Sequence, residues 1–333
     1  MFDAKTMFDM FASKKVLAQE TAPIIADAEK PVLAGLGAGQ LTKALPLYFE
    51  QFAKEWQALT AQDNFDGFRL EAGKAVTKNL QASHSLILGT NLRECGYLYQ
   101  FGPTWQSVDG RTFATARVGL DGAVNGRYGT KFGSNVELKL SASSSLKDAQ
   151  RNGGEFELGY LGKHNTAALK FVHQGTWILN TSYAQEISDN LWLGSELTFI
   201  PMNGISLTSF GARYVTGPHM LSGTVGQQPD FKARSPLDSS TTSKVQYVKK
   251  VSDRLSLGAE VETSFPDRDS ALRLGYEYTF RQAKVQGMVD TAGRVSCFVS
   301  DFMGFGVSGA IDYLKGDYKF GFMMHIVPQP EQQ

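Results

Sequence analysis

Apolar and polar side chains alternate along most of this chain, from residue 67 to residue 326. In one typical stretch, Leu138 and Leu140 alternate with Glu137, Lys139 and Ser141. Successive side chains of a β-strand point to opposite faces, so this alternation predicts strands with one apolar and one polar face. The alternating stretches are about ten residues long, whereas strands of globular proteins usually have about five or six.

Short breaks divide the alternating region into nineteen predicted strands. Breaks such as residues 162–165 and 252–253 contain glycine, asparagine, aspartate or serine, which favour tight turns, and connections this short join antiparallel neighbours. Between residues 204 and 215 the alternation is lost midway, which indicates a β-bulge. The predicted strands start near residues 67, 79, 96, 111, 122, 134, 154, 165, 176, 190, 204, 218, 242, 254, 270, 282, 293, 304 and 317.

An open sheet of so many strands would leave two long unpaired edges, and closing it into a barrel removes them. Tilted strands of about 9 to 11 residues also match a hydrocarbon core about 30 Å thick. We therefore predict an all-β fold, a 19-stranded transmembrane β-barrel that is antiparallel except where the first and last strands close the ring. The apolar faces contact lipid, and the polar faces line a water-filled lumen. The alternative is a soluble all-β binding protein, such as a large sandwich or a solenoid.

Composition excludes several other classes of protein. Lys and Arg number 33, as do Asp and Glu, so the net charge is zero. A strongly basic nucleic-acid binder and an acidic disordered chaperone are both excluded. Two cysteines and five scattered histidines give neither a disulfide framework nor a metal spacing, and no nucleophile–base pair can be identified. We expect no cofactor, no metal and no enzymatic activity.

The chain before the first strand has a different pattern. Residues 1–66 are predicted to form a leader, residues 67–326 the barrel, and residues 327–333 a C-terminal tail. Within the leader, Tyr48, Phe52 and Trp56 fall on one face of an amphipathic helix at about residues 45–60. The first residues have neither an apolar core nor a cleavage site, so we expect no secretory signal.

Three stretches resemble a known family, the mitochondrial protein-import channel, which is the pore subunit of the outer-membrane translocase. Residues 79–89, followed by residues 99–102, look like its second and third strands, and residues 121–127 resemble its Gly-x-x-Asn-x-Arg stretch. The last strand resembles the sorting signal of mitochondrial barrels, carried here by Lys319, Gly321, Met324 and Ile326. An odd strand number also fits mitochondrial porins, which have 19 strands, better than bacterial barrels.

A sister family with the same fold, the voltage-dependent anion channel, is the alternative. The leader of about 65 residues is longer than the short helix of the anion channel, whose Gly-Leu-Lys signature is not found here. The predicted lumen also carries both signs of charge. These features favour the import channel, in a divergent member.

The resemblance implies a passive channel in the mitochondrial outer membrane that passes unfolded precursor proteins. It places the helix with Tyr48, Phe52 and Trp56 inside the lumen, although a helix on the membrane surface or against a partner remains the alternative. The implied partners are membrane lipid, precursors with targeting sequences, receptors, small single-helix subunits and further copies of the barrel, but no nucleic acid. The charged residues expected to line the pore and the path of targeting sequences are Glu71, Arg117, Arg127, Glu137, Lys139, Glu155, Glu157, Glu196, Glu260, Glu262, Arg273, Glu277 and Asp290.

Overall fold

The computed structural model describes residues 46–60, 65–89, 96–146, 152–202, 204–229, 239–265 and 268–326. These residues form nineteen strands in one sheet. Each strand begins within three residues of its predicted start. The strands are β1 (Gly67–Thr77), β2 (Leu80–Leu88), β3 (Tyr97–Gln106), β4 (Thr112–Gly119), β5 (Ala123–Phe132), β6 (Val136–Ser145), β7 (Gly153–Leu161), β8 (Asn165–Gln174), β9 (Thr176–Ser188), β10 (Leu191–Ile200), β11 (Ile205–Thr216), β12 (His219–Pro229), β13 (Ser239–Lys250), β14 (Leu255–Phe265), β15 (Asp269–Thr279), β16 (Ala283–Asp290), β17 (Arg294–Asp301), β18 (Phe305–Asp312) and β19 (Asp317–Ile326).

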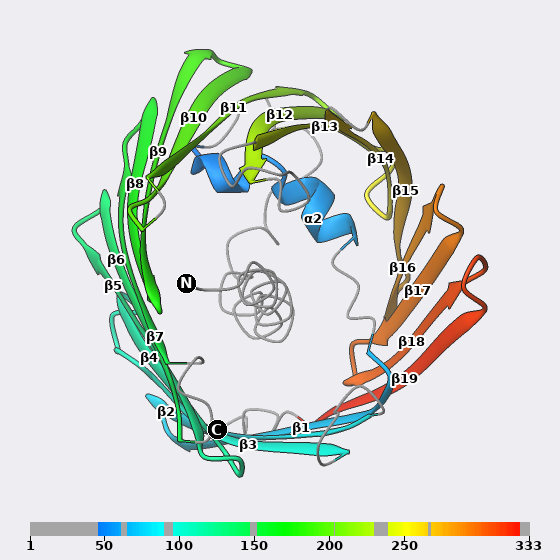
Figure 1. Ribbon diagram of the computed structural model, residues 1–333. Helices are drawn as coiled ribbons and strands as arrows, with labels where there is room; N and C mark the ends of the chain where they lie inside the picture. The colour runs from blue at the N-terminus through cyan, green and yellow to red at the C-terminus, as the bar shows by residue number, and fades with distance from the viewer. Residues whose placement is uncertain are drawn as a thin grey trace.

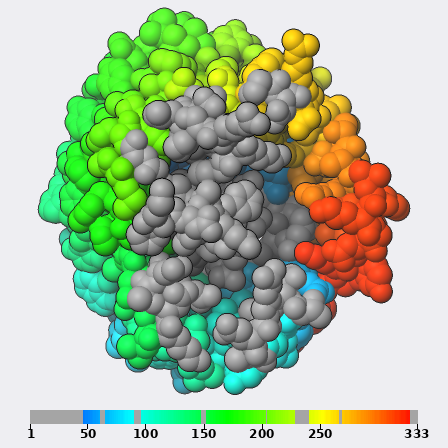
Figure 2. All heavy atoms as spheres, in the orientation of Figure 1, coloured from blue at the N-terminus to red at the C-terminus, as the bar shows by residue number. Residues whose placement is uncertain are grey.

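The sheet closes into a barrel, as predicted. Every strand pairs with its neighbours in chain order, and all of these pairs are antiparallel except that of β1 with β19. The parallel pair runs from Gly67 opposite Gly321 to Ala72 opposite Ile326. Figure 1 shows the resulting ring, and the space-filling view in Figure 2 shows a continuous wall from cyan through green and yellow to red.

The outer face of the wall is apolar. Side chains such as Phe210, Leu274 and Phe320 expose 62%, 50% and 61% of their surface because no part of the described chain covers them. A belt of exposed apolar side chains around a closed barrel is the surface that lipid covers in transmembrane barrels. No helix among the described residues is long and apolar enough to cross a membrane.

The predicted β-bulge between residues 204 and 215 is wrong. β11 pairs with β10 without a shift from Ile205 opposite Ile200 to Tyr214 opposite Leu191. The alternation is lost because an apolar residue faces the lumen and a polar residue faces outward at this end of the strand. Leu207 lies opposite the lumenal residue Thr198, and Thr208 lies opposite Leu197 on the outer face. There, Thr208 donates a hydrogen bond of 3.3 Å to Gln227.

The helical part of the leader is shorter than predicted. Within residues 46–60, a 3₁₀-helix η1 (Phe49–Gln51) precedes an α-helix α2 (Lys54–Thr60), with a turn between them. Phe49 packs on β10 and β11 while Trp56 packs on β14, and a tighter turn lets both rings reach their positions. Residues 1–45 of the predicted leader and the predicted tail at residues 327–333 lie outside the described residues.

Candidate functional site in the lumen

Residues 46–60, called the lumenal segment from here on, lie inside the ring of strands (Figure 1). η1 contacts β9 and β10, and α2 contacts β13, β14, β15 and β16. Tyr48, Phe52 and Trp56, the three residues predicted for a lumenal helix, are 8%, 1% and 5% exposed. The apolar stripe therefore faces the barrel wall, and the opposite side of the segment faces the interior.

Two pairs of glycines form the surface on which the segment packs. Gly194 lies directly opposite Gly211, and Gly258 directly opposite Gly275. A Cβ atom at Gly194 or Gly211 would lie 2.7 or 2.8 Å from the ring of Phe49, and one at Gly258 would lie 3.0 Å from the ring of Trp56. Real Cβ atoms essentially never approach as closely as at Gly194 and Gly211, and the contact at Gly258 is tighter than most of theirs, so glycine at these positions lets the rings reach the wall.

Apolar side chains on the lumenal face surround the glycine pairs. Trp192 is 1% exposed, Val248 is 5% exposed, and Val215 and Met220 are each 8% exposed. They form one buried cluster with Phe49, Phe52, Trp56 and Leu59 of the segment. These wall residues were not predicted from the sequence, although they are large apolar residues at positions where the alternation requires polar ones.

Polar contacts fix the segment at both ends. Thr166 on β8 donates a hydrogen bond of 2.9 Å to the carbonyl of Leu47, and Gln286 on β16 donates one of 2.8 Å to the carbonyl of Ala58. Between them, Arg213 on β11 forms an ion pair with Glu55. Arg213 is 5% exposed, and removing one partner of a buried ion pair leaves an uncompensated charge.

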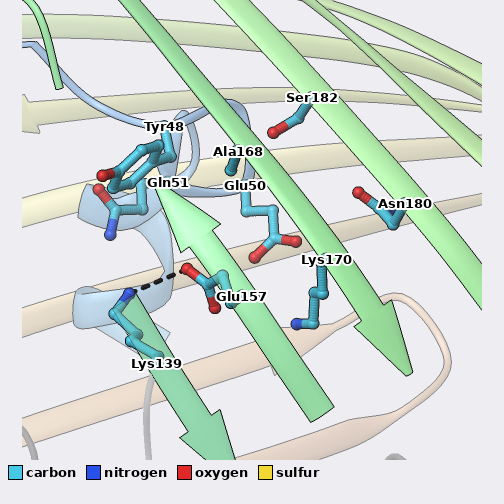
Figure 3. Close-up of a pocket in the computed structure, with 9 residues that line it drawn as sticks. All are labelled: Tyr48, Glu50, Gln51, Lys139, Glu157, Ala168, Lys170, Asn180 and Ser182. Carbon is cyan, nitrogen blue, oxygen red and sulfur yellow. Dashed lines mark hydrogen bonds and ion pairs between the residues drawn. The ribbon is translucent and has the colours of Figure 1, made fainter. Parts of the chain in front are cut away.

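A pocket of about 80 Å³ lies between η1 and the wall. Figure 3 shows the carboxylates of Glu50 and Glu157 and the ammonium groups of Lys139 and Lys170 around the same space. This volume is enough for a few water molecules or for the charged head of one side chain. We call it the acidic pocket; its lining residues are Tyr48, Glu50, Gln51, Lys139, Glu157, Ala168, Lys170, Asn180 and Ser182.

Two carboxylates and two cations line the acidic pocket, and two further carboxylates, Glu155 and Glu196, lie close to it. Lys139 pairs with Glu157 at 3.0 Å and Lys170 with Glu155 at 2.5 Å, and Asn180 donates a hydrogen bond to Glu196. Partial desolvation within the barrel raises the pKa of the Glu50 carboxyl; Lys170 lowers it, and Glu196, Glu157 and Glu155 raise it further. Glu50 was not predicted as a site residue, because it lies off the apolar stripe of its own segment and only the fold brings it close to these acids.

The predicted lumenal acids lie on one face of the wall, and most of them are paired with a cation. Arg273 contacts Glu260 at 2.5 Å, Glu262 at 2.9 Å and Asp290 at 3.6 Å. The other pairs are Glu71 with Arg69 at 2.6 Å, Glu137 with Lys131 at 3.1 Å, and Glu277 with Lys284 at 3.0 Å. Cross-strand pairing thus neutralises much of the acidity that the sequence predicted for the pore. Arg117 and Arg127 lie on the same face, on β4 and β5.

The four residues of the predicted sorting signal lie on β19, where it pairs with β1. Gly321 lies opposite Gly67, and its missing side chain leaves room for the ring of Phe65, which would lie 2.5 Å from a Cβ atom. Ser308 donates a hydrogen bond of 2.8 Å to the carbonyl of Phe65. Gly321 therefore has a structural role where the chain enters β1. Lys319 shares its face, whereas Met324 and Ile326 lie on the outer face with Phe322.

The family model described as eukaryotic porin matches residues 45–321. The chain is 25% identical over 293 residues to the "Probable mitochondrial import receptor subunit TOM40-2" of Arabidopsis thaliana, covering 83% of this chain and 89% of that one. It is 24% identical to the "Mitochondrial import receptor subunit TOM40" of Saccharomyces cerevisiae, covering 77% and 71% of the two chains. The tom40 subunit of Neurospora crassa is 23% identical, covering 78% and 75%. The chain therefore belongs to the eukaryotic porin family, as a divergent member similar to TOM40 and a porin-type barrel of the mitochondrial outer membrane.

Proposed function

We propose that this barrel conducts unfolded precursor proteins across the mitochondrial outer membrane. The acidic pocket is the observation that carries the proposal. Glu50 and Glu157 line it together with Lys139 and Lys170, and the nearby carboxylates of Glu155 and Glu196 bring this cluster to four carboxylates against two ammonium groups. A cationic side chain of a targeting sequence would complete this cluster.

The mechanism is passive binding and release along a polar lumen. Ion pairs in a wet site are weakened by water and salt, so each contact with a moving polypeptide is modest. Weak contacts suit a conduit, because a tightly bound chain would not leave. The lumenal segment contributes by holding Glu50 against the wall at a fixed place beside Lys170.

We also propose that the barrel works within a complex. The relatives are named as mitochondrial import receptor subunits, which supports work within a complex. The partners that we propose are receptors, small single-helix subunits and further barrels. These partners would supply the direction of transport, because a passive lumen favours neither side.

The second candidate is a voltage-dependent anion channel that conducts metabolites. Arg117 and Arg127 favour it, because no carboxylate of the described residues forms an ion pair with either of them. Ion selectivity separates the two candidates, since an anion channel prefers anions and an import channel with an acidic pocket prefers cations.

The test of the proposal is a bilayer recording of the reconstituted barrel before and after addition of a cationic amphipathic targeting peptide. We expect cation preference and voltage-dependent block by the peptide. The double variant Glu50→Gln, Glu196→Gln should weaken the block about tenfold, equivalent to about 1.4 kcal/mol. Asp253→Asn, which changes an acid in a turn outside the pocket, is the control. The peptide should block this variant as strongly as it blocks the wild-type barrel. Anion preference without block would contradict the proposal.

The block should also depend on pH through Glu50. Because its pKa is raised, Glu50 takes up a proton at a higher pH than an ordinary glutamate, and block should weaken as pH falls through that pKa. The protonated form is favoured in the folded state, so the contribution of Glu50 to stability is present at low pH and lost as pH rises. Glu50→Gln should remove this part of the pH profile, and an unchanged profile would contradict the role of Glu50.

A further inference from the structure

The arginine pair, Arg117 on β4 and Arg127 on β5, differs from the other cations of the lumen. Arg69, Lys131, Lys139, Lys170, Lys244, Arg273, Lys284 and Arg294 each have a carboxylate within 4.0 Å on their own or a neighbouring strand. For the part of the chain that the structure describes, neither member of the arginine pair has such a partner. Lys250 at the end of β13 and Lys319 on β19 share this property, but each of them stands alone.

The two arginines lie at neighbouring positions of the wall. Arg117 is opposite Asn125, and Arg127 is two residues further along β5, opposite Thr115 on one side and Ser141 on the other. Arg117 also lies within electrostatic range of Arg69 and Glu71 on β1. Glu71 is already paired with Arg69. Glu155 and Glu157, which line a pocket with Arg127, are already paired with Lys170 and Lys139. Within the described ranges, the nearby carboxylates are therefore all bound to other cations, and the arginine pair is left without one.

The stem of Arg117 packs closely on the wall. A Cβ atom at Gly102 on β3 would lie 3.1 Å from Cγ of Arg117 and 3.2 Å from the hydroxyl of Ser83. That hydroxyl donates a hydrogen bond of 2.8 Å to the carbonyl of Gly102. The glycine thus lets the arginine lie against the backbone of β3, which limits where its guanidinium can reach.

The spacing of the pair fits an extended polypeptide. Diagonal positions on neighbouring strands are about 7–8 Å apart, and alternate residues of an extended chain are about 6.6 Å apart on one side of it. A guanidinium group also binds a carboxylate through two parallel hydrogen bonds. Two carboxylates at alternate positions of one extended chain would therefore match both arginines.

We infer that the arginine pair binds acidic side chains at alternate positions of a polypeptide passing through the lumen. The inference rests on the proposed function and adds a second, oppositely charged contact to it. Ser141 links the two sites: it lies opposite Arg127 and also opposite Glu155, to which it donates a hydrogen bond of 3.4 Å. Basic and acidic parts of one passing chain therefore bind at adjacent places on β4–β9.

The experiment uses two acidic peptides of identical composition in the bilayer recording. One has glutamates at alternate positions, separated by serine, and the other has its glutamates in one block. The alternating peptide should block the wild-type barrel at a lower concentration. Arg117→Gln combined with Arg127→Gln should weaken its block about tenfold, whereas Lys131→Gln, which removes a paired cation of β5, should change it little. Arg117→Lys with Arg127→Lys should give an intermediate loss, because charge remains but the two parallel hydrogen bonds do not.

Two outcomes would overturn the inference. Equal block by both acidic peptides would show that spacing is not recognised, and prevention of the block by inorganic pyrophosphate at a lower concentration than either peptide needs would show a site for compact anions. The cationic targeting peptide is tested on the same variants. If the cationic peptide blocks and the acidic peptides do not, the inference fails while the proposed function stands; if neither class of peptide blocks, both fail.

Discussion

Leucine at Gly258 together with leucine at Gly275 is expected to displace α2 from the wall. A Cβ atom at Gly258 would lie 3.0 Å from the ring of Trp56, and one at Gly275 would lie 2.5 Å from Leu59. The nearest atoms that the two leucines would meet are the ring of Trp56 and the side chains of Leu59 and Thr60, all on α2. Loss of the packing of a buried aromatic side chain costs about 3–5 kcal/mol, which is more than the few hydrogen bonds that hold the segment can offset.

Trypsin cleavage after Lys54 and single-channel conductance measure the displacement. The variant should be cleaved faster than the wild-type barrel, and its conductance should become larger and noisier because the segment no longer lies against β13–β16. Gly126→Leu is the matched control, since nothing lies within 4 Å of a Cβ atom there. Unchanged cleavage and conductance in the double variant would show that the glycine pairs do not position the segment.

Arginine in place of Leu140 is expected to destabilise the barrel by about 2–4 kcal/mol. Leu140 lies near the middle of β6 and exposes 39% of its surface on the outer face, where a charged group would meet the centre of the bilayer. Urea unfolding of the barrel in lipid vesicles gives the difference in free energy directly.

Ser141→Arg is the control for this change, one residue further along the same strand. Ser141 faces the lumen between Arg127 and Glu155, where a guanidinium group remains hydrated and gains a carboxylate partner on one side, against the like charge of Arg127 on the other. We expect a change in conduction with little change in stability. Equal destabilisation by both substitutions would mean that the two faces of β6 have been assigned wrongly.

The wall could be predicted from the sequence because its constraint acts on every strand separately. Each strand must present apolar groups to lipid and polar groups to water. The alternation within a single strand, such as Leu138 and Leu140 against Glu137 and Lys139, therefore predicts both of its faces without knowledge of any other strand. Turn residues then divided the pattern into strands whose starts differ from the observed ones by three residues at most.

The lumenal site could be predicted only in part, because it depends on contacts between distant parts of the chain. Trp192 and Val248 interrupt the polar phase of their strands, but their partner is a segment more than a hundred residues away. The register places Glu157 between Lys139 on β6 and Lys170 on β8, yet only Lys139 pairs with it, while Lys170 pairs diagonally with Glu155. The alternation within a strand predicts which face of the wall a side chain occupies, but it does not predict which residue of another strand that side chain will contact.

Transport of a polypeptide into vesicles measures protein conduction by this barrel. Vesicles that contain the barrel and enclose streptavidin are mixed with an unfolded, biotinylated polypeptide that carries a basic targeting sequence. We expect the polypeptide to accumulate on the enclosed streptavidin, and we expect Glu50→Gln with Glu196→Gln to slow its entry. Rapid entry of a small biotinylated anion while the polypeptide stays outside would contradict protein conduction and identify a metabolite channel.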